Sequence, residues 1–369
     1  MLVVRGAVKD YDWGIVDGLS AWTGSMTGEP QAELWFGVHP GGPSPLIDGA
    51  GALTGEVLAD RFDVRNIPIL VKLLAAARPL SVQVHPTTAT ARRMWRAQQD
   101  GSGEAVLTDP FEKTEMLVAL GPFEAFAGWR DLDQAAAILA GLSGCEQAVA
   151  ALVLGDEKAA IVALLEVRDV AAAVATLPVA ASAAGLIGSE LHAYATVAAL
   201  FPADSGALLT PLMAFVSLAE GESVYVPAGV PHSYVRGTGL EVMTSSDNVL
   251  RLGLTPKAVF VDEALAAIEL DAAPVVLRTT VGQEVAPAGA PFAATLHRSG
   301  TVDAPTGEYR IVLLVEGEAR VSTDGADIDL RPGTAAVLAA ADPSASVTVS
   351  GLTAVVTAAG TGRSKDEGA

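Results

Sequence analysis

The chain has 369 residues, of which 50% are hydrophobic and 18% are charged, a composition that excludes a disordered protein and favours two or three folded modules. Its 43 acidic and 23 basic residues give a formal charge of −20, which disfavours binding to nucleic acid or to an anionic membrane surface. The single cysteine, Cys145, excludes an intrachain disulfide and a zinc–thiolate cluster. Together with an N-terminal apolar stretch too short for a signal peptide, it predicts a cytoplasmic protein.

The first 130 residues are predicted to be mainly β and residues 131–200 mainly helical. "IPILVKLLAA" and "PLSVQVHP" have the composition of consecutive strands separated at Arg78 and Pro79. Residues 131–200 are rich in Ala, Leu and Val, with charges at helical spacing. Within them, residues 170–189 carry no charge, but their small side chains and Pro178 indicate packed helix and loop rather than a membrane span.

Strand signals return after residue 202 and continue to about 360, with one helix-like stretch at 255–270. Two segments of this region resemble each other, "FVSLAEGESVYVPAGVPH" and "VLLVEGEARVS" followed by "LRPGTAAVLAAADP". Each has a β-run ending in Glu-Gly-Glu, then a turn and another β-run. The first has a histidine where the second has Asp342 or no counterpart. This likeness predicts two small β-barrels, of which only the first has a working site.

Two polar side chains interrupt the strand predicted at 81–86. Gln83 and His85 lie two positions apart, and because side chains alternate along a strand, both project from one face. Inside a barrel that face is the interior. Taken alone, such a pair is more often a hydrogen-bonded pair in a core than a ligand set.

A second histidine changes this interpretation. "GESVYVPAGVPH" has the spacing Gly-x5-Pro-x-Gly-x2-His and ends at His232. This spacing is similar to the second motif of the cupin superfamily, although Arg236 stands where that motif usually has asparagine. Pro227 and Gly229 predict a tight turn that aims His232 inward. Two histidines on separate strands of one small barrel can converge on a divalent ion.

A carboxylate should complete the site, and "DPFEKTEMLVAL" offers two. Glu115 enters an apolar run and is expected inside, whereas Glu112 lies in the polar turn before it. Gln83, His85, Glu115 and His232 then form an amide, imidazole and carboxylate set suited to one zinc ion per chain.

The predicted fold class is therefore mainly β with an α insertion: a cupin-type β-barrel (jelly roll) holds the site, and a second β-barrel follows it. The predicted ranges are 1–130 and 201–260 for the catalytic cupin-type domain, 131–200 for the helical insertion, 261–360 for a C-terminal cupin-like domain without metal ligands, and 361–369 for a disordered tail.

At these residues the chain resembles the type I phosphomannose isomerase, or mannose-6-phosphate isomerase, family. The likeness covers most of the chain and is loosest in the C-terminal module. Its segments are "YDWG" at 11–14, "AELWFGVHP" at 32–40, "PILVKLLAAARPLSVQVHP" at 68–86, "DPFEKTEM" at 109–116, "FEAFAGWR" at 123–130 and "VPAGVPHSYVRGTGLEVMTSSDNVLRLGLTPK" at 226–257. The resemblance implies zinc bound by the same four residues and Arg251 in the active site. "DPFEKTEM" departs from the family's more usual Asn-His-Lys-Pro-Glu pattern but keeps Lys113 and Glu115.

The reaction implied by the resemblance interconverts mannose 6-phosphate and fructose 6-phosphate by proton transfer through a cis-enediol. It needs a base, a stabiliser for an oxyanion and a group that holds the phosphate. Glu241 and Lys72 are the candidates for proton handling. Simple alternation from His232 would turn Glu241 outward, but a turn at "RGTG" is expected to break the register. Lys72 lies in an apolar strand, where burial is expected to depress its pKa; a solvent-facing edge position is the alternative.

Arg251 suits an enediolate oxygen or a phosphate, and a surface ion pair with Asp247 is its alternative role. Together with zinc, the lysines would offset the negative charge of the chain near an anionic substrate. The substrate-binding candidates are Ser81, Lys113, Tyr234, Asp247 and Lys257.

Other notable residues are assigned structural roles. Trp13 and Trp35 are expected in the core, with a place in the pocket lining as the alternative, and Cys145 is expected as a small apolar helix residue. His39 has Gly37 two positions before it instead of a polar partner, and neither His192 nor His297 has ligand spacing. No glycine-rich nucleotide-binding loop is present, so neither ATP nor NAD is expected.

Two other functions remain open: an iron-dependent cupin dioxygenase, and a non-catalytic sugar-binding or regulatory cupin. Gln83 and the cation set disfavour the first, and the complete ligand set disfavours the second. The expected partner is a small sugar phosphate, with no nucleic acid and no membrane. A monomer is expected because no feature requires an assembly. Mannose catabolism and the supply of mannose donors for glycan synthesis are both compatible with the sequence.

Overall fold

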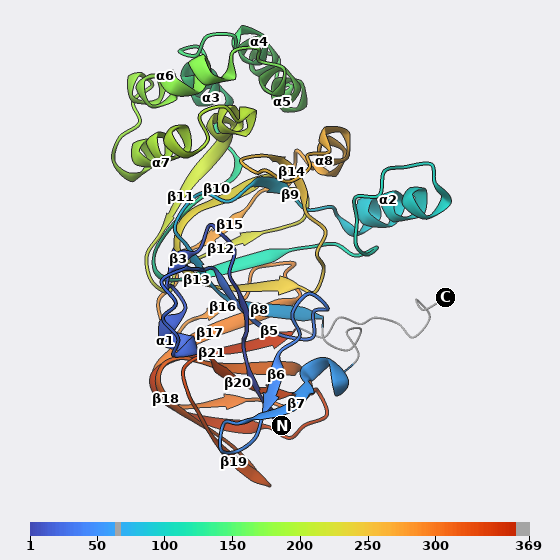
Figure 1. Cartoon of the computed structure of the whole chain (residues 1–369), viewed down its shortest axis with the longest axis vertical. Helices are drawn as coiled ribbons and strands as arrows, with labels where there is room; N and C mark the ends of the chain where they lie inside the picture. Colours follow the sequence, from blue (N-terminus) through green and yellow to red (C-terminus); the bar gives the residue numbers. More distant parts are fainter. Residues whose placement is uncertain (63–67, 359–369) are drawn as a thin grey trace.

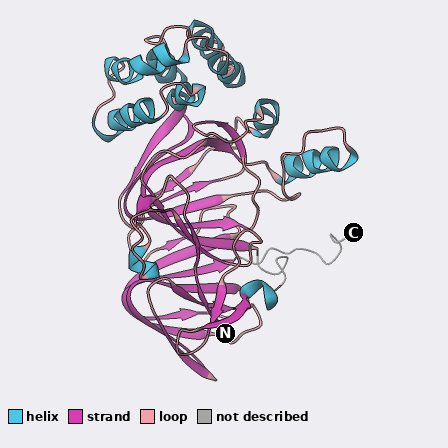
Figure 2. Cartoon of the chain, viewed as in Figure 1, coloured by secondary structure: helices cyan, strands magenta, loops and turns pink. Residues whose placement is uncertain are grey.

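The computed structural model describes residues 1–62 and 68–358. The helices within residues 132–200 gather at one end of the long axis, and the strands of two β modules, with the other helices beside them, occupy the rest (Figure 1). Taken over the whole described chain, strands predominate over helices (Figure 2). The expected fold class, mainly β with an α insertion, is confirmed. The predicted tail at 361–369 lies outside the described residues.

The first module is a single hydrogen-bonded sheet of strands from three parts of the chain. Its strands are β2 (Ala7–Lys9), β5 (Glu33–Phe36), β8 (Ile69–Ala76), β9 (Val82–Val84), β10 (Glu115–Trp129), β11 (Met213–Leu218), β12 (Ser223–Val226), β13 (His232–Thr244), β14 (Leu250–Gly253) and β15 (Val275–Leu277). The main order is β15-β12-β10-β13-β8-β5-β2, with β11 on β10 and the β9–β14 pair on β13.

Two long strands, β10 and β13, shape this module. They pair antiparallel along their lengths. The first half of β10 also pairs with β12 and its second half with β11, while β13 pairs with β9 at its start and with β8 at its end. The sheet therefore divides into two halves that share β10 and β13. Buried side chains from both halves, such as Leu74, Leu117 and Val216, meet in one cluster between them.

The second module repeats this plan. Its strands are β1 (Leu2–Arg5), β6 (Pro45–Ile47), β7 (Leu53–Val57), β16 (Glu284–Val285), β17 (Phe292–Ala304), β18 (Tyr309–Thr323), β19 (Ala326–Leu330), β20 (Thr334–Leu338) and β21 (Ala345–Ala358). A small pair, β3 (Ile15–Val16) and β4 (Pro30–Gln31), lies apart from both sheets. One hydrophobic cluster joins the two modules, since it includes Leu73 and Val242 of the first and Ile311 and Val356 of the second.

The module boundaries expected from the sequence are crossed in both directions. Strands β1, β6 and β7 fall in the range assigned to the first module, yet β1 pairs with β20 of the second. Strand β15 falls in the range assigned to the second module, yet it pairs with β12 of the first. Local sequence cannot identify these partners, because an edge strand joins whichever sheet lies beside it.

The helices lie mainly in the expected insertion. They are α1 (Ser20–Thr23), α2 (Thr88–Asp100), α3 (Leu132–Leu139), α4 (Glu146–Val153), α5 (Glu157–Leu165), α6 (Val170–Ala183), α7 (Gly188–Leu200) and α8 (Val261–Ala267), with 3-10 helices η1 (Leu58–Asp60) and η3 (Ser205–Leu212). Helix α2 was not expected, although Thr87 caps its first turn and Gly101 ends it in the left-handed conformation. In the described ranges, no helix has both the length and the apolar character needed to cross a membrane.

The expected internal repeat is visible in the strand pairing, but its Glu-Gly-Glu segments are not equivalent. Residues 220–222 connect β11 and β12, whereas Glu316, Gly317 and Glu318 lie inside β18, at a register shift. The equivalent units are β10 to β13 and β18 to β21. In each unit the long first strand pairs with the three strands that follow it.

This equivalence places an arginine where the first module has its candidate metal-binding carboxylate. Glu115 lies opposite Val226, and Arg310 lies opposite Leu338, the last residues of β12 and β20. Arg310 is fully buried. Its guanidinium donates hydrogen bonds of 2.7–3.1 Å to the carbonyl oxygens of residues 304, 339, 342 and 343. A fixed side-chain cation thus organises the β20–β21 loop of the second module.

We expect Arg310→Met to lower the free energy of unfolding by about 3 kcal/mol or more, because buried carbonyl groups lose their donors. Denaturant titration measures the change. Arg320→Met is the matched control on the same strand: Arg320 is exposed and pairs with the exposed Asp329, so its loss should leave the free energy of unfolding nearly unchanged. Equal losses in the two variants would contradict the structural role of Arg310.

Candidate metal centre and substrate pocket

The four residues predicted as metal ligands lie together at the ends of three strands. Gln83 is in β9 and His85 follows it, while Glu115 begins β10 and His232 begins β13. The ligand atoms of His85, Glu115 and His232 all lie within 4.8 Å of one another, and the three side chains are buried. Each carboxylate oxygen of Glu115 lies 3.3 Å from the Nε2 atom of one histidine.

Backbone carbonyl groups fix the orientation of both imidazole rings. Nδ1 of His85 lies 2.8 Å from the carbonyl oxygen of Asn248, and Nδ1 of His232 lies 3.0 Å from that of Val230. Since a carbonyl oxygen only accepts, each Nδ1 carries the hydrogen. Each Nε2 is therefore left with a lone pair that faces Glu115, as a metal ligand requires.

Gln83 completes the group from the adjacent strand position. Strand pairing sets Gln83 opposite His232 and also opposite Arg251. Its Nε2 lies 3.1 Å from Nε2 of His232, and its Oε1 accepts a hydrogen bond from the Ser81 hydroxyl. A half-turn of the amide would bring its oxygen to the side of the imidazole nitrogens, where it can serve as a fourth ligand.

Buried polar atoms at this point fit a divalent cation. Among the described residues, Nε2 of His85 and Oε2 of Glu115 have no hydrogen-bond partner. Burial lowers the pKa of His85 to about 4, and Lys113 contributes in the same direction. Burial would raise the pKa of Glu115, but Lys113 and His85 together hold it well below its usual value. Neutral imidazole, ionised carboxylate and amide oxygen are a donor set suited to zinc.

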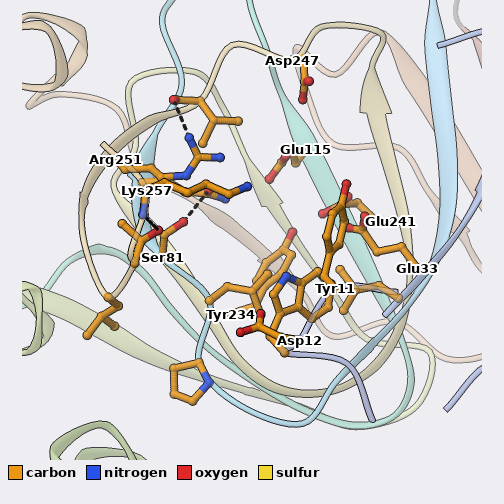
Figure 3. Close-up of a pocket in the computed structure, with 18 of the residues that line it drawn as sticks. Tyr11, Asp12, Glu33, Ser81, Glu115, Tyr234, Glu241, Asp247, Arg251 and Lys257 are labelled. Carbon is orange, nitrogen blue, oxygen red and sulfur yellow. Dashed lines mark hydrogen bonds between the residues drawn. The ribbon is translucent and has the colours of Figure 1, made fainter. Parts of the chain in front are cut away.

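A cavity of about 450 Å³ opens beside this group. Figure 3 shows Arg251, Lys257 and Ser81 on one side of the view, Glu33 and Glu241 on the other, and Glu115 between them. The volume is in the range of small-ligand sites. The cavity is therefore polarised, with cations toward one side and carboxylates toward the other.

Buried charges form the acidic side. Nζ of Lys72 lies 2.7 Å from Oε2 of Glu241 and 3.5 Å from Oε1 of Glu33. Burial alone would lower the pKa of Lys72, but Glu241 and Glu33 outweigh it and raise the pKa above its usual value. The expectation of a depressed lysine pKa is thus wrong. The two carboxylates therefore favour the charged form of Lys72.

Glu241 faces the cavity because of a bulge. On β13, Tyr234 lies opposite Ala125 and Arg236 opposite Glu124, so Val235 has no partner on β10. One extra residue exchanges the two faces of the strand. The expected turn at "RGTG" does not form, since these residues lie inside β13. A break in register does occur, and it turns Glu241 toward Lys72.

The basic side is built from separate segments. Arg251, on β14, is half-buried and donates to the carbonyl of Val249 at 3.4 Å. Among the ion pairs of the described residues, none joins it to Asp247. Lys113 is buried and lies 2.8 Å from Glu115, while Lys257 is exposed above the Tyr11 ring.

Every predicted substrate-binding residue lines the cavity, namely Ser81, Lys113, Tyr234, Asp247 and Lys257. Tyr234 is buried and, among the described residues, its hydroxyl lacks a hydrogen-bond partner. Burial raises its pKa well above the usual value, and the Glu241 carboxylate adds to the effect. Tyr234 is therefore a neutral donor available to a ligand.

The residues assigned structural roles fall in several places. Trp35 is buried and also lines the cavity, and Trp13 lines it while half-buried. His39 accepts a hydrogen bond from the Gly41 amide and packs edge-on against Trp35. Cys145 is a buried free thiol at the N-cap of α4 rather than within the helix.

Sequence reasoning missed Glu33 and Tyr11 as cavity residues. Glu33 is buried, accepts a hydrogen bond of 2.8 Å from the Trp35 indole and pairs with Lys72. A signal was present, because Glu33 is a carboxylate in an otherwise apolar strand, the same signal that drew attention to Lys72. Tyr11 lies in the segment "YDWG", which contributes only to the family resemblance, and its position beside the cavity depends on tertiary contacts.

The fold and the buried ligand group define a mainly β protein with a metal-binding site inside its first module. Comparisons with known proteins give the family. The model of the phosphomannose isomerase type I catalytic domain matches residues 1–132. Mannose-6-phosphate isomerase of Escherichia coli is 30% identical, over 90% of this chain and 93% of that protein. Mannose-6-phosphate isomerase 1 of Arabidopsis thaliana is 30% identical, over 69% of this chain and 67% of that protein.

Solved structures agree. A mutant of phosphomannose isomerase from Salmonella typhimurium superimposes with a TM-score of 0.83 at 28% identity, covering 97% of this chain and 99% of that one. A mannose 6-phosphate isomerase bound with zinc and yttrium gives a TM-score of 0.81 at 29% identity, with the same coverage. The chain belongs to the type I phosphomannose isomerase family.

We expect His232→Ala to abolish stoichiometric zinc binding, because it removes one of two imidazole ligands and leaves Glu115 without its second partner. Metal analysis after dialysis against zinc measures this loss. His192→Ala, in the helical region, is the control and should retain the wild-type zinc content. Full zinc occupancy in the His232 variant would refute the assignment.

Proposed function

We propose that this chain is a zinc-dependent isomerase that interconverts mannose 6-phosphate and fructose 6-phosphate by proton transfer through a cis-enediol. The observation that carries the proposal is the buried group of His85, Glu115 and His232 at the wall of a cavity with opposed charges. Family membership supports the same reaction. A cytoplasmic, monomeric protein remains the prediction from the sequence.

Gln83, His85, Glu115 and His232 are the residues that would hold one zinc ion per chain. When bound, the ion would polarise the sugar carbonyl and stabilise negative charge on the sugar oxygens. Lys113, 2.8 Å from Glu115, adds a second positive charge at the same wall. These charges favour an anionic intermediate inside a chain whose formal charge is −20.

The basic side of the cavity is proposed to bind the phosphate. Arg251 offers a planar pair of donors, and the Ser81 hydroxyl and Lys257 ammonium lie on the same side in Figure 3. With the phosphate there, the reacting end of the sugar extends toward Glu241 and Lys72. Tyr234 offers its unpaired hydroxyl to a sugar oxygen between them.

Glu241 is the proposed base, because Lys72 stays protonated. Its carboxylate would take the proton from C2 of the aldose and return it to C1, while a second proton moves from the oxygen on C2 to that on C1. Lys72, 2.7 Å from Glu241, keeps the carboxylate ionised and in position. Burial raises the pKa of Glu241, which makes it a stronger base than an exposed glutamate.

A coupled assay with mannose 6-phosphate tests the proposal. We expect turnover with zinc and loss of turnover with a chelator. Arg251→Ala should keep its zinc but lose about 100-fold or more in kcat/KM, because the phosphate or enediolate loses a fixed cation. Arg168→Ala, an exposed arginine of the helical region, is the control. A zinc-loaded wild-type protein without turnover would leave a non-catalytic cupin as the function.

The pH profile tests the base. A protonated Glu241 cannot accept the C2 proton, so kcat/KM should fall as pH falls through a pKa above the ordinary glutamate value. The charges of Lys72 and Lys113 lower the pKa of Glu241, and those of Glu115 and Glu33 raise it. Lys72→Met should therefore move the acidic limb of the residual activity to higher pH. The control Lys158→Met, remote in α5, should leave the acidic limb of the pH profile at its wild-type position. If the acidic limb of the Lys72 variant also stays at its wild-type position, a group other than Glu241 is the base.

A further inference from the structure

We propose that Asn248 is a positioning residue whose single buried side chain sets the geometry, and so the zinc affinity, of the metal centre. Asn248 lies between β13 and β14 and is fully buried. It is not among the residues that line the cavity, nor is it one of the candidate metal ligands. This inference deepens the proposed function, on which it rests for the identity of the ion.

The Asn248 amide is saturated by one segment, residues 108–111. Its Nδ2 donates to the carbonyl oxygens of Asp109 and Phe111, both at 2.8 Å, and to Oδ1 of Asp109 at 3.0 Å. Its Oδ1 accepts from the backbone N–H of Thr108 at 2.9 Å and from the Thr108 hydroxyl at 3.2 Å. Because both the Nδ2 donors and the Oδ1 acceptor of Asn248 are used, these bonds fix the position of residues 108–111 against Asn248.

That segment leads directly to the carboxylate ligand. Lys113 and Glu115 follow Phe111 within four residues, and their side chains meet at 2.8 Å. The path from Phe111 to the start of β10 is too short to absorb a displacement of the loop. The Asn248 side chain thus determines where the Glu115 carboxylate and the Lys113 ammonium lie.

The same residue orients a second ligand through its main chain. The carbonyl oxygen of Asn248 accepts the Nδ1 hydrogen of His85 at 2.8 Å. Three residues later, Arg251 lies opposite Gln83 in the β14–β9 pairing. Asn248 therefore connects the segments that carry His85, Glu115 and Arg251. Partners behind the ligands of a metal typically change its affinity by about 10- to 100-fold when mutated.

Asn248→Asp is the informative variant, since it keeps the shape but replaces the donor. The three oxygens that Nδ2 now serves would face a carboxylate, and Asp109 would face a like charge. Gln98 offers a matched control: its amide exchanges two hydrogen bonds with the backbone of Leu107, at 2.9 and 3.0 Å, from helix α2. Gln98→Glu makes the same chemical change to the same loop, one residue before the Asn248 contacts.

The experiment measures the zinc affinity of the full chain by competition with a chromophoric chelator, with circular dichroism to establish folding. We expect Asn248→Asp to weaken zinc binding by about 10- to 100-fold. Gln98→Glu should stay within about 3-fold of wild type. Wild-type affinity in a folded Asn248 variant would overturn the proposal, and so would an equal loss in both variants.

Asp109→Ala keeps the test decisive if Asn248→Asp does not fold. It removes one of the three Nδ2 acceptors and leaves both carbonyl contacts, so a smaller weakening of zinc binding is expected. Unchanged affinity in this variant would then overturn the proposal. The measurement needs no turnover: a wild-type chain that binds zinc but fails to isomerise defeats the proposed function alone.

Discussion

This site depends on one buried carboxylate, that of Glu115, which lies close to two imidazole rings and one ammonium group. Glu115 is the first residue of β10, where the strand pairs with β12 on one side and with β13 on the other. An isolated carboxylate there would be costly, because its hydration is lost. Lys113 compensates in part, but the two histidines turn lone pairs toward the carboxylate, and Oε2 of Glu115 has no hydrogen-bond partner among the described residues. A divalent cation is the partner that satisfies these atoms together.

The second module offers an internal comparison. At the strand position of Glu115 it has Arg310, and the loop that follows β20 is held by donors from that guanidinium. The same arrangement of strands therefore surrounds the guanidinium of Arg310 in the second module and the candidate metal ligands in the first. The pairing pattern is thus kept between the two modules, while the charge at this interior position is reversed.

The cavity separates charge along its length. Glu33, Glu241 and Lys72 form a buried group with one more negative than positive charge, and the basic residues lie across the cavity from it. For an anionic substrate, this arrangement favours one orientation over its reverse, because the phosphate is repelled from the carboxylates. In the proposed reaction, this charge distribution would direct the reacting carbons toward Glu241 without requiring a close fit around every hydroxyl group.

The fold class, the helical insertion and the four candidate metal ligands could be predicted from the sequence, because strand alternation, the Gly-Pro-Gly-His spacing and a carboxylate at the start of an apolar run are local properties. It could not determine that Lys72 stays charged, since its pKa depends on Glu33 and Glu241, which are 39 and 169 residues away in sequence. Nor could it assign β1 and β15 to their sheets, or locate the bulge at Val235 that turns Glu241 inward. Partners distant in sequence decide these features, and only the folded chain brings them together.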